Sequence, residues 1–431
     1  MKRFFYFVIV ILGISALVGT HTSCKKKEVF DEDIYDTLIK IVSPVDSVDP
    51  YHNWELSTQK DLIVTVNSGV GAKKILIFDK NPFDSESAQI IASTDAEEGD
   101  RFGISVSYPT ASGVLFLAAI DSLGNYTIAA INPSDRDVDF TNTFIKQQRL
   151  AYTPLPQYYA FCYEQEYPEP GDYDYNDVVM HIALERANPR EMYFHVRLAA
   201  VGGDIPIAAF LRLPEIGYED VDTAYTVNGE SFNKNLTEQY MQVIKLNELM
   251  LKGLTGEPIL NIFLDAHWAT GDIIEADYGL VKRKRYNVTK QSDKNSQLMV
   301  PREVTFVLKF KTDTQANAIT LDNIDPFIMR LYNGASMEVH TYKYRESTAL
   351  EKYKYIDVGH LPWALKIPIG SFRHPLHGVN IGFRMKDSGS QYLFGAYSRK
   401  GNSFGEWASD RNSCLNWYLP EYSTENQVFV W

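Results

Sequence analysis

The chain has 431 residues, with 42 Lys and Arg against 55 Asp and Glu, and a formal net charge of −13. This acidic balance argues against a general nucleic-acid-binding protein, which needs cationic surface to displace counterions from phosphates. An apolar fraction of 45% and the abundance of Tyr and Phe exclude a disordered chain. The length leaves room for two or three compact domains, and three cysteines are too few for a disulfide framework.

Residues 1–23 have the pattern of a secretory signal peptide. Two basic residues precede an apolar run over residues 4–18, which is shorter than the ~20 residues that a membrane-spanning helix needs. The cysteine after this segment, Cys24, resembles the processing site of a bacterial lipoprotein, although His21 stands where an aliphatic residue is usual. The alternative is an ordinary signal peptide followed by an incidental cysteine. Acylated Cys24 would anchor a soluble body to a membrane, and residues 24–45 are then expected to form a tether.

Residues 46–135 show the alternation of short apolar stretches and turn residues that is typical of a β domain. β-Branched and aromatic residues fill each stretch, and Gly, Pro, Asn or Asp bounds it. A hairpin loop is expected over residues 121–125, which include Gly124. A small N-terminal antiparallel β-sandwich is therefore predicted, with strands over residues 62–66, 74–78, 103–107, 114–118 and 126–130.

Residues 136–157 are expected to link this sandwich to a larger β domain over residues 158–431. Strands of this domain are predicted over residues 178–185, 192–198, 207–213, 259–264 and 305–310. The predicted fold class is thus all-β, with a second domain of the β-sandwich or jelly-roll type. Cys162 and Cys414 could pair in an oxidising compartment, but their aromatic neighbours favour two buried thiols.

The motif with the clearest chemistry is Gly-Asp-Tyr-Asp-Tyr-Asn-Asp at residues 171–177. Calcium binds six to eight oxygen ligands, which closely spaced carboxylates, amides and carbonyls supply. The motif resembles the start of an EF-hand loop, but it lacks the turn glycine and the distal glutamate, so an EF-hand is excluded. A tight turn whose side chains accept hydrogen bonds from their own backbone is the alternative. Clustered carboxylates repel one another unless a metal ion or a nearby Lys or Arg compensates them.

Residues 160–177 resemble the signature of the LruC domain family, in which an acidic aromatic segment precedes Gly-Asp-Tyr-Asp-Phe-Asn-Asp. Further matching elements lie at residues 325–328, 338–340, 361–364 and 406–418, so that the resemblance spans roughly residues 155–425. Glu164 keeps an acidic position of the signature, whereas Gln165 replaces an acid. The resemblance implies a surface lipoprotein or secreted protein of Bacteroidetes-like or spirochaete-like bacteria, and therefore an outer-membrane location.

Two patterns that suggest catalysis or zinc binding are not supported by their context. Residues 401–405 fit the nucleophile-elbow pattern G-x-S-x-G, but no histidine follows Ser403, as the order of the triad requires. The pair His374 and His377 lacks the further ligands of a zinc site and is expected to be two exposed loop residues.

Two other patterns have simple structural interpretations. The basic run at residues 282–285 is predicted to be a solvated hairpin tip rather than a nucleic-acid site. A set of large aromatic residues could stack on sugars, but packing in the β core is the favoured interpretation; this set comprises Trp363, Trp407, Trp417 and Tyr418.

These observations predict a lipid-anchored structural, adhesion or binding protein of the cell surface, stabilised by calcium and without catalysis. The predicted calcium ligands are Asp172, Asp174, Asn176 and Asp177, with Glu164 as a more distant contributor. A cell-surface protein or a glycan is the expected partner besides the membrane, and no nucleic acid is expected. The alternative is a glycan-binding surface lipoprotein of a polysaccharide-capture system. A hydrolase of unrecognised type is a third possibility, which a deep pocket with two carboxylates of shifted pKa would favour.

Overall fold

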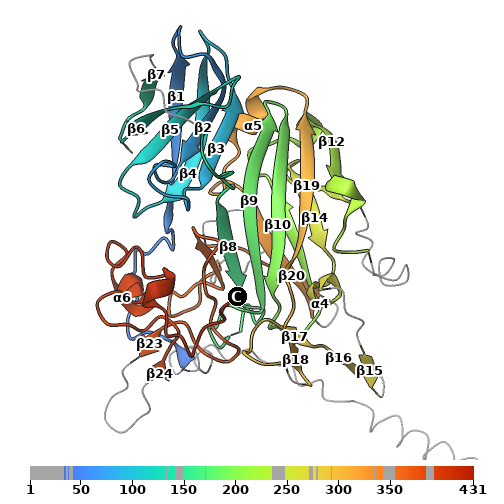
Figure 1. Cartoon of the computed structure of the whole chain (residues 1–431). Helices are drawn as coiled ribbons and strands as arrows, with labels where there is room; N and C mark the ends of the chain where they lie inside the picture. Colours follow the sequence, from blue (N-terminus) through green and yellow to red (C-terminus); the bar gives the residue numbers. More distant parts are fainter. Residues whose placement is uncertain are drawn as a thin grey trace, which may run out of the picture.

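The computed structural model describes residues 42–132, 134–140, 149–169, 171–234, 248–270, 275–277, 280–292, 294–332, 335–342, 355–384 and 393–431, with Ile34 and Thr37. The predicted signal peptide, Cys24 and most of the predicted tether lie outside these residues. The described part is built almost entirely from β-strands (Figure 1), which confirms the predicted fold class. Within it, no helix is both long and apolar enough to span a bilayer.

The N-terminal domain is a sandwich of two sheets. The first sheet has the order β4 (Arg101–Pro109), β1 (Ser57–Val66), β7 (Asp137–Phe140). The second has the order β3 (Ile90–Asp95), β2 (Ala72–Phe78), β5 (Leu115–Asp121), β6 (Tyr126–Ile131). In the second half of β1 every second side chain is buried, namely Leu62, Val64 and Val66, because neighbouring residues of a strand point to opposite faces.

The predicted strands and hairpin of this domain are confirmed, and the structure adds two strands, β3 and β7. Asp121 and Asn125 close the predicted loop between β5 and β6 through the Asp121 amide, which donates to the Asn125 carbonyl at 3.1 Å. β7 pairs with β1 in parallel, whereas the other pairs of the two sheets are antiparallel. β7 lies within residues 136–157, the segment predicted as a linker.

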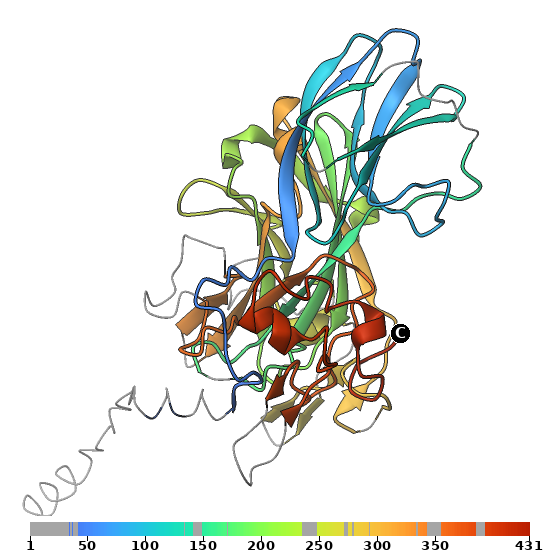
Figure 2. The same cartoon turned by 90° about the vertical axis from the view of Figure 1, so that its left-hand side faces the viewer.

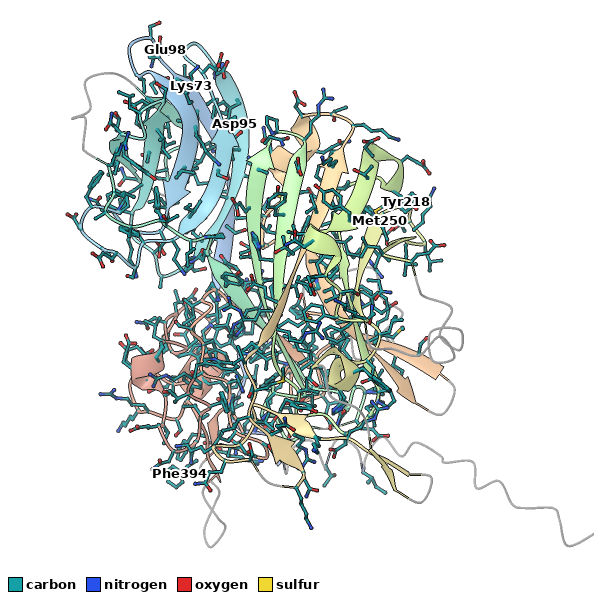
Figure 3. The ribbon with its side chains drawn as sticks, turned by 45° about the vertical axis from the view of Figure 1, so that its right-hand side comes forward. Lys73, Asp95, Glu98, Tyr218, Met250 and Phe394 are labelled. Carbon is teal, nitrogen blue, oxygen red and sulfur yellow. The ribbon has the colours of Figure 1, made fainter. Side chains whose placement is uncertain are left out.

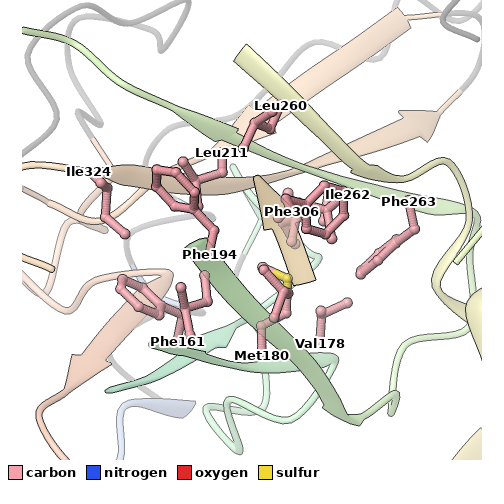
Figure 4. Close-up of a cluster of buried hydrophobic side chains, with 14 of the residues drawn as sticks. Phe161, Val178, Met180, Phe194, Leu211, Leu260, Ile262, Phe263, Phe306 and Ile324 are labelled. Atoms are coloured by element: carbon pink, nitrogen blue, oxygen red, sulfur yellow. The ribbon is translucent and has the colours of Figure 1, made fainter. Parts of the chain in front are cut away.

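The larger domain contains a second sandwich. Its six-stranded sheet has the order β12 (Val221–Thr226), β19 (Arg302–Phe310), β10 (Glu191–Ala200), β9 (Val178–Asn188), β8 (Tyr158–Tyr163), β22 (Ala364–Ile367). Its five-stranded sheet has the order β13 (Met250–Lys252), β14 (Pro258–Phe263), β11 (Ile207–Arg212), β20 (Asp325–Tyr332), β21 (Ala335–Val339). Side chains from both sheets, including Phe161, Phe194 and Leu211, form the core between them (Figure 4).

A second layer covers the other face of the six-stranded sheet. Along β8, Tyr159, Phe161 and Tyr163 point into the sandwich core, whereas Ala160 and Cys162 point into this layer. The layer consists mainly of loops of the C-terminal segment, with β23 (Phe383–Arg384), β24 (Leu393–Phe394), α6 (Phe404–Ser409) and η3 (Pro420–Tyr422). Val45, Trp54 and Leu56 also pack in it, so residues preceding β1 cross the larger domain before the N-terminal sandwich begins. Burial on both faces explains why the first six residues of β9 are all buried and, apart from His181, apolar.

The remaining short elements lie in connections of the larger domain. They are η1 (Tyr218–Asp220), η2 (Val227–Gly229), α4 (Ala266–Ala269), β15 (Glu275–Asp277), β16 (Leu280–Lys282), β17 (Arg285–Tyr286), β18 (Ser296–Gln297) and α5 (Thr314–Ala318). Figure 3 shows that side chains fill the space between the sheets. In the same view, Glu98 of the N-terminal domain and Phe394 of the C-terminal layer lie at opposite ends of the molecule.

The N-terminal domain lies against one end of the larger sandwich (Figures 1 and 2). Arg186 of β9 is buried there, and its guanidinium donates to the Ser93 carbonyl of β3 at 2.7 Å and to the Ala316 carbonyl of α5. At the same junction, the hydroxyl of Ser57, the first residue of β1, donates to the Asp322 carboxylate of the larger domain. The ammonium of Lys366 lies 2.5 Å from this carboxylate and 2.7 Å from that of Glu55, just before β1. Polar contacts between buried groups therefore hold the two domains together.

The large aromatic residues are part of the core, as predicted. Trp363, Trp407, Trp417 and Tyr418 are each at most 2% exposed. The ring centroids of Trp407 and Trp417 lie 5.6 Å apart inside the second layer. These four residues therefore do not form an exposed platform for sugars.

Two predictions of exposed residues are wrong in part. His374 is buried and its Nε2 lies 2.7 Å from the Asn287 carbonyl, because the loop that carries it packs under the C-terminal residues; His377 is exposed, as predicted. In the basic run, Arg283 is not solvated: its guanidinium lies 2.7 Å from the fully buried carboxylate of Asp265. Cys162 and Cys414 are both free thiols, and only Cys162 is fully buried.

Ser403, the serine of the rejected nucleophile pattern, caps helix α6. Its hydroxyl accepts a hydrogen bond from the Glu406 amide at 3.2 Å and donates to the Glu406 carboxylate at 2.9 Å. The Glu406 carboxylate in turn accepts from the Ser403 amide at 3.0 Å, which completes a capping box.

We expect Ser403→Ala to lower the free energy of unfolding by about 1 kcal/mol, since one N-terminal amide of α6 loses its acceptor. Urea denaturation would measure this change. Ser409→Ala, at the other end of the helix, is the control and should change stability less. An unchanged denaturation midpoint in Ser403→Ala would contradict the capping role.

Candidate metal centre between β8 and β9

The acidic motif lies in the connection between two neighbouring antiparallel strands. The last residue of β8, Tyr163, pairs with the first residue of β9, Val178. Continuing this register by one residue brings Glu164 opposite Asp177, and the Gln165 amide donates to the Asp177 carboxylate at 2.8 Å. The local fold therefore places two acids that are distant in sequence side by side.

The tyrosines of the motif hold the loop in shape. Tyr173 and Tyr175 have left-handed backbone conformations, with φ of 56° and 49°, which cost roughly 1–2 kcal/mol per residue. Both side chains are buried in the second layer. The Tyr173 hydroxyl donates to the Asp357 carboxylate at 2.6 Å, and the Tyr175 hydroxyl donates to the Pro362 carbonyl at 2.8 Å. Burial and these hydrogen bonds offset the backbone strain.

The acids around this loop form two adjacent groups of oxygen ligands. Carboxylate oxygens of Glu164, Glu166 and Asp177 lie within 4.8 Å of one another. Ligand atoms of Asp172, Asp174 and His377 also lie within 4.8 Å of one another. We call these six residues and Asn176 the acidic centre, after its five carboxylates. Its seven residues are Glu164, Glu166, Asp172, Asp174, Asn176, Asp177 and His377.

Some oxygens of the acidic centre accept hydrogen bonds from the backbone, as the capped-turn interpretation predicts. Asp174 accepts from the amides of Asn176 at 3.1 Å and Gly378 at 2.8 Å. Glu164 accepts from the Tyr175 amide at 2.5 Å through Oε1 only. A turn stabilised by its own side chains therefore accounts for part of the arrangement.

Other oxygens remain without a hydrogen-bond partner. Glu164 Oε2, Glu166 Oε2 and Asn176 Oδ1 are buried and accept no hydrogen bond from the described residues. Two glycines leave room for these oxygens because they have no side chain. A Cβ atom on Gly171 would lie 2.2 Å from Glu164 Oε2, and a Cβ atom on Gly202 would lie 2.0 Å from Asn176 Oδ1. Buried polar atoms normally have partners, so these three oxygens are available to a ligand.

Burial and mutual repulsion disfavour the ionised form of the carboxyl groups in the acidic centre. Burial raises the pKa of Glu164 well above its usual range, and the four other carboxylates of the centre raise it further. Burial is also the main cause that raises the pKa of Asp174, Asp177 and Glu166. Groups with such shifts favour either a proton or a bound cation.

Basic side chains do not compensate these carboxylates in the described part of the chain. No Lys or Arg there forms an ion pair with the acidic centre, and Arg285 pairs instead with Asp204 at 2.8 Å. The Nδ1 atom of His377 lies 3.7 Å from Asp174, but burial and then the charge of Arg285 lower the pKa of His377. The compensation that a neighbouring Lys or Arg could supply is therefore missing among these residues.

The residues fit a hard cation. Five carboxylates and the Asn176 amide oxygen are the ligand types that calcium prefers. His377 is the one nitrogen donor among them, and it belongs to the more exposed group with Asp172. Zinc sites favour several nitrogen or sulfur ligands, so the composition of the acidic centre is closer to that of a calcium site.

Five of the seven residues are among the predicted ligands. The structure divides them between the two groups, with Asp172 and Asp174 in the more exposed group and Glu164 and Asp177 in the other. Asn176 belongs to neither group of mutually close ligand atoms. Glu166 was missed, although its place two residues after Glu164 on the same segment was a usable signal. His377 was missed because 200 residues separate it from Asp177, and only the packing of the second layer brings it to the loop.

Fold and site together define a two-domain β-sandwich protein with a buried acidic centre at the end of its largest sheet. The chain belongs to the family described as "Domain of unknown function (DUF4842)", which matches residues 190–407. This match includes most of the larger sandwich and His377, and it begins after the acidic motif. No curated protein and no solved structure is detectably similar to the chain.

Proposed function

We propose that this protein is a non-catalytic structural, adhesion or binding protein of the cell surface, whose larger domain binds Ca²⁺ at the acidic centre. One observation carries the metal assignment. The acidic centre contains five carboxylates, three of them almost fully buried, and none forms an ion pair with a Lys or Arg of the described residues. Three of its buried oxygens accept no hydrogen bond there. A bound Ca²⁺ would supply the missing charge and occupy the free lone pairs.

The anchoring part of the proposal rests on the first 24 residues. The signal-like segment and Cys24 support lipidation and attachment to the bacterial outer membrane with the body exposed at the surface. The resemblance of the acidic motif to the LruC signature supports the same location. The partner would then be a protein or glycan of the cell surface.

A hydrolase at the acidic centre is less well supported. Its carboxylates have raised pKa values, as a general acid requires. Glu164 is fully buried and Asp174 is 1% exposed, so a substrate has no access to them. The pKa shifts are better explained by a cation site than by catalysis.

The glycan-binding alternative also loses its main argument. The aromatic residues that suggested sugar stacking are buried in the second layer and the sandwich core. Other surfaces could still bind a glycan, and a screen with immobilised polysaccharides would test this class. Retention on such a polysaccharide would favour the alternative over a purely structural role.

We expect Ca²⁺ to stabilise residues 25–431 against heat. If 1 mM Ca²⁺ exceeds the dissociation constant about 100-fold, the native state gains ~2.7 kcal/mol, which corresponds to a rise in melting temperature of roughly 5–10 °C for a domain of this size. Scanning calorimetry after chelation, with and without added Ca²⁺, would measure it. Mg²⁺ at the same concentration is the control for ionic strength. Equal melting temperatures in chelator and in Ca²⁺ would contradict the proposed site.

A further inference from the structure

A cavity of about 380 Å³ lies where the larger sandwich meets the N-terminal domain. Its walls come from β8, β22, the end of β11 and the segments that precede β1 and β20. Phe161 and Ile324, two of its apolar residues, lie on the same side of the sandwich core in Figure 4. Cavities of this size at domain junctions are a common location of small-molecule sites.

Among the described residues of the cavity wall, acidic side chains outnumber basic ones. These residues supply five carboxylates, those of Glu55, Glu215, Glu257, Asp322 and Asp325. They supply two basic groups, Arg212 and Lys366. The described part of the wall therefore has an excess of three acidic groups over basic ones.

Both basic groups already have acidic partners. Lys366 contacts Glu55 and Asp322, as described above for the domain contact. The guanidinium of Arg212 lies 3.4 Å from a carboxylate oxygen of Glu257 and 3.6 Å from one of Glu338 behind the wall. Each basic group is therefore neutralised by two carboxylates, and neither is left to bind an anion.

A buried histidine compensates only part of the remaining charge. The Nδ1 atom of His340 lies 2.9 Å from Asp325, and its Nε2 lies 3.0 Å from Glu338. Burial alone would lower the pKa of His340, but these two carboxylates outweigh burial and raise it. With Glu338 and His340 included, six carboxylates still face three basic groups in the described part of the chain.

Burial of the wall residues strengthens the electrostatic effect of the excess carboxylates. The side chains of Asp322 and Glu257 are 2% and 5% exposed, and charges interact more strongly where water is excluded. Asp322 Oδ2 accepts no hydrogen bond from the described residues. Glu215, in contrast, is exposed at the rim, and no ion pair of Glu215 is seen among those residues. The cavity thus has acceptor oxygens both at its rim and in its wall.

We propose that this cavity binds an organic cation of the ammonium or guanidinium class, either a free amine or the side chain of a basic residue in a peptide. Such a group donates several N–H bonds to the excess acceptor oxygens and neutralises the excess charge at once. A neutral sugar would satisfy hydrogen bonds without neutralising the charge, and an anion would be repelled. This site is separate from the acidic centre and does not depend on Ca²⁺.

Isothermal titration calorimetry of residues 25–431 at low salt, in saturating Ca²⁺, tests the proposal. The two cationic probes are agmatine and the peptide Ala-Ala-Arg-Ala-Ala with acetylated and amidated ends, and maltose is the neutral probe. Binding of agmatine alone would indicate a free amine, and binding of the peptide would indicate a basic side chain. We expect the affinity to fall when the salt concentration is raised, because the contact is between charges.

Charge reversal at the rim locates the site. Glu215→Lys should weaken binding about tenfold or more, and the exposed Glu215 is expected to tolerate the change. Glu230→Lys, at another exposed position outside the cavity, is the matched control and should leave the affinity unchanged. Glu164→Gln should also leave it unchanged, which separates this site from the acidic centre. Absence of binding by both cations, equal binding of maltose, or an unaltered affinity in Glu215→Lys would each overturn the proposal.

Discussion

Replacing Glu164 by Gln is expected to abolish the Ca²⁺-dependent rise in melting temperature and, at the same time, to stabilise the protein in chelator. Gln keeps an oxygen that can accept from the Tyr175 amide, so the hydrogen bond at 2.5 Å is preserved. It removes one negative charge from a fully buried position whose pKa is raised by burial and by four neighbouring carboxylates. Without a metal this charge opposes folding, whereas with Ca²⁺ it contributes a ligand.

The two opposite effects distinguish a metal ligand from a residue with only a structural role. A structural role predicts that Glu164→Gln lowers stability by a similar amount in chelator and in Ca²⁺. Calorimetric melting of both proteins under both conditions measures the difference directly. Glu169→Gln removes a carboxylate from an exposed position of the same connection and is the matched control. A Ca²⁺ response in Glu164→Gln equal to that of the unaltered protein would contradict the assignment of Glu164.

The same carboxylates predict an unusual dependence of stability on pH in chelator. Because the folded-state pKa values of Glu164, Asp174 and Asp177 lie above their unfolded-state values, the folded protein binds more protons. Stability should therefore rise as the pH falls from 8 through these raised values towards the unfolded-state pKa near 4. Saturating Ca²⁺ should remove or reverse this trend, since protons and the metal compete for the same oxygens.

Replacing Lys366 by Met is expected to lower the free energy of unfolding of the larger domain by about 3–5 kcal/mol. The Lys366 side chain is 6% exposed, and its partners Asp322 and Glu55 are 2% and 12% exposed. Attraction to these two carboxylates outweighs the burial of Lys366 and raises its pKa. Met fills a similar volume but leaves two buried carboxylates without a cation, which is the reason for the large effect.

Denaturation followed by tryptophan fluorescence would measure this loss, because all six tryptophans lie outside residues 57–140. Lys309→Met is the control: its ion pair with Glu191 spans 3.7 Å and is 44% exposed on the lysine side, so a change below ~1 kcal/mol is expected. Adding Asp322→Asn to Lys366→Met should recover part of the stability. If Lys366→Met behaved like Lys309→Met, the proposed role of the buried ion pairs at the domain junction would be wrong.

Local patterns in the sequence were sufficient for about half of the strands in the two sandwiches. The β-branched stretch at residues 62–66 predicted the second half of β1, because such side chains favour the extended backbone of a strand. The short loop with Gly124 predicted the hairpin between β5 and β6. Several strands were not predicted, among them β3, β7, β8 and, in the larger sandwich, β12, β13, β20, β21 and β22. β7 has only four residues, and β8 is buried on both faces, so that no alternation of burial distinguishes it from other apolar segments.

The acidic centre shows the same division between local and long-range information. The sequence by itself determined that Asp172, Asp174, Asn176 and Asp177 lie in one loop, because all four are within seven consecutive residues. Tertiary structure alone decided that Glu164 faces Asp177, that His377 joins them, and that no Lys or Arg of the described residues pairs with them. It also decided the burial that raises the pKa values of these acids. Strand register and the packing of the C-terminal layer set these features, and both depend on contacts between residues far apart in the chain.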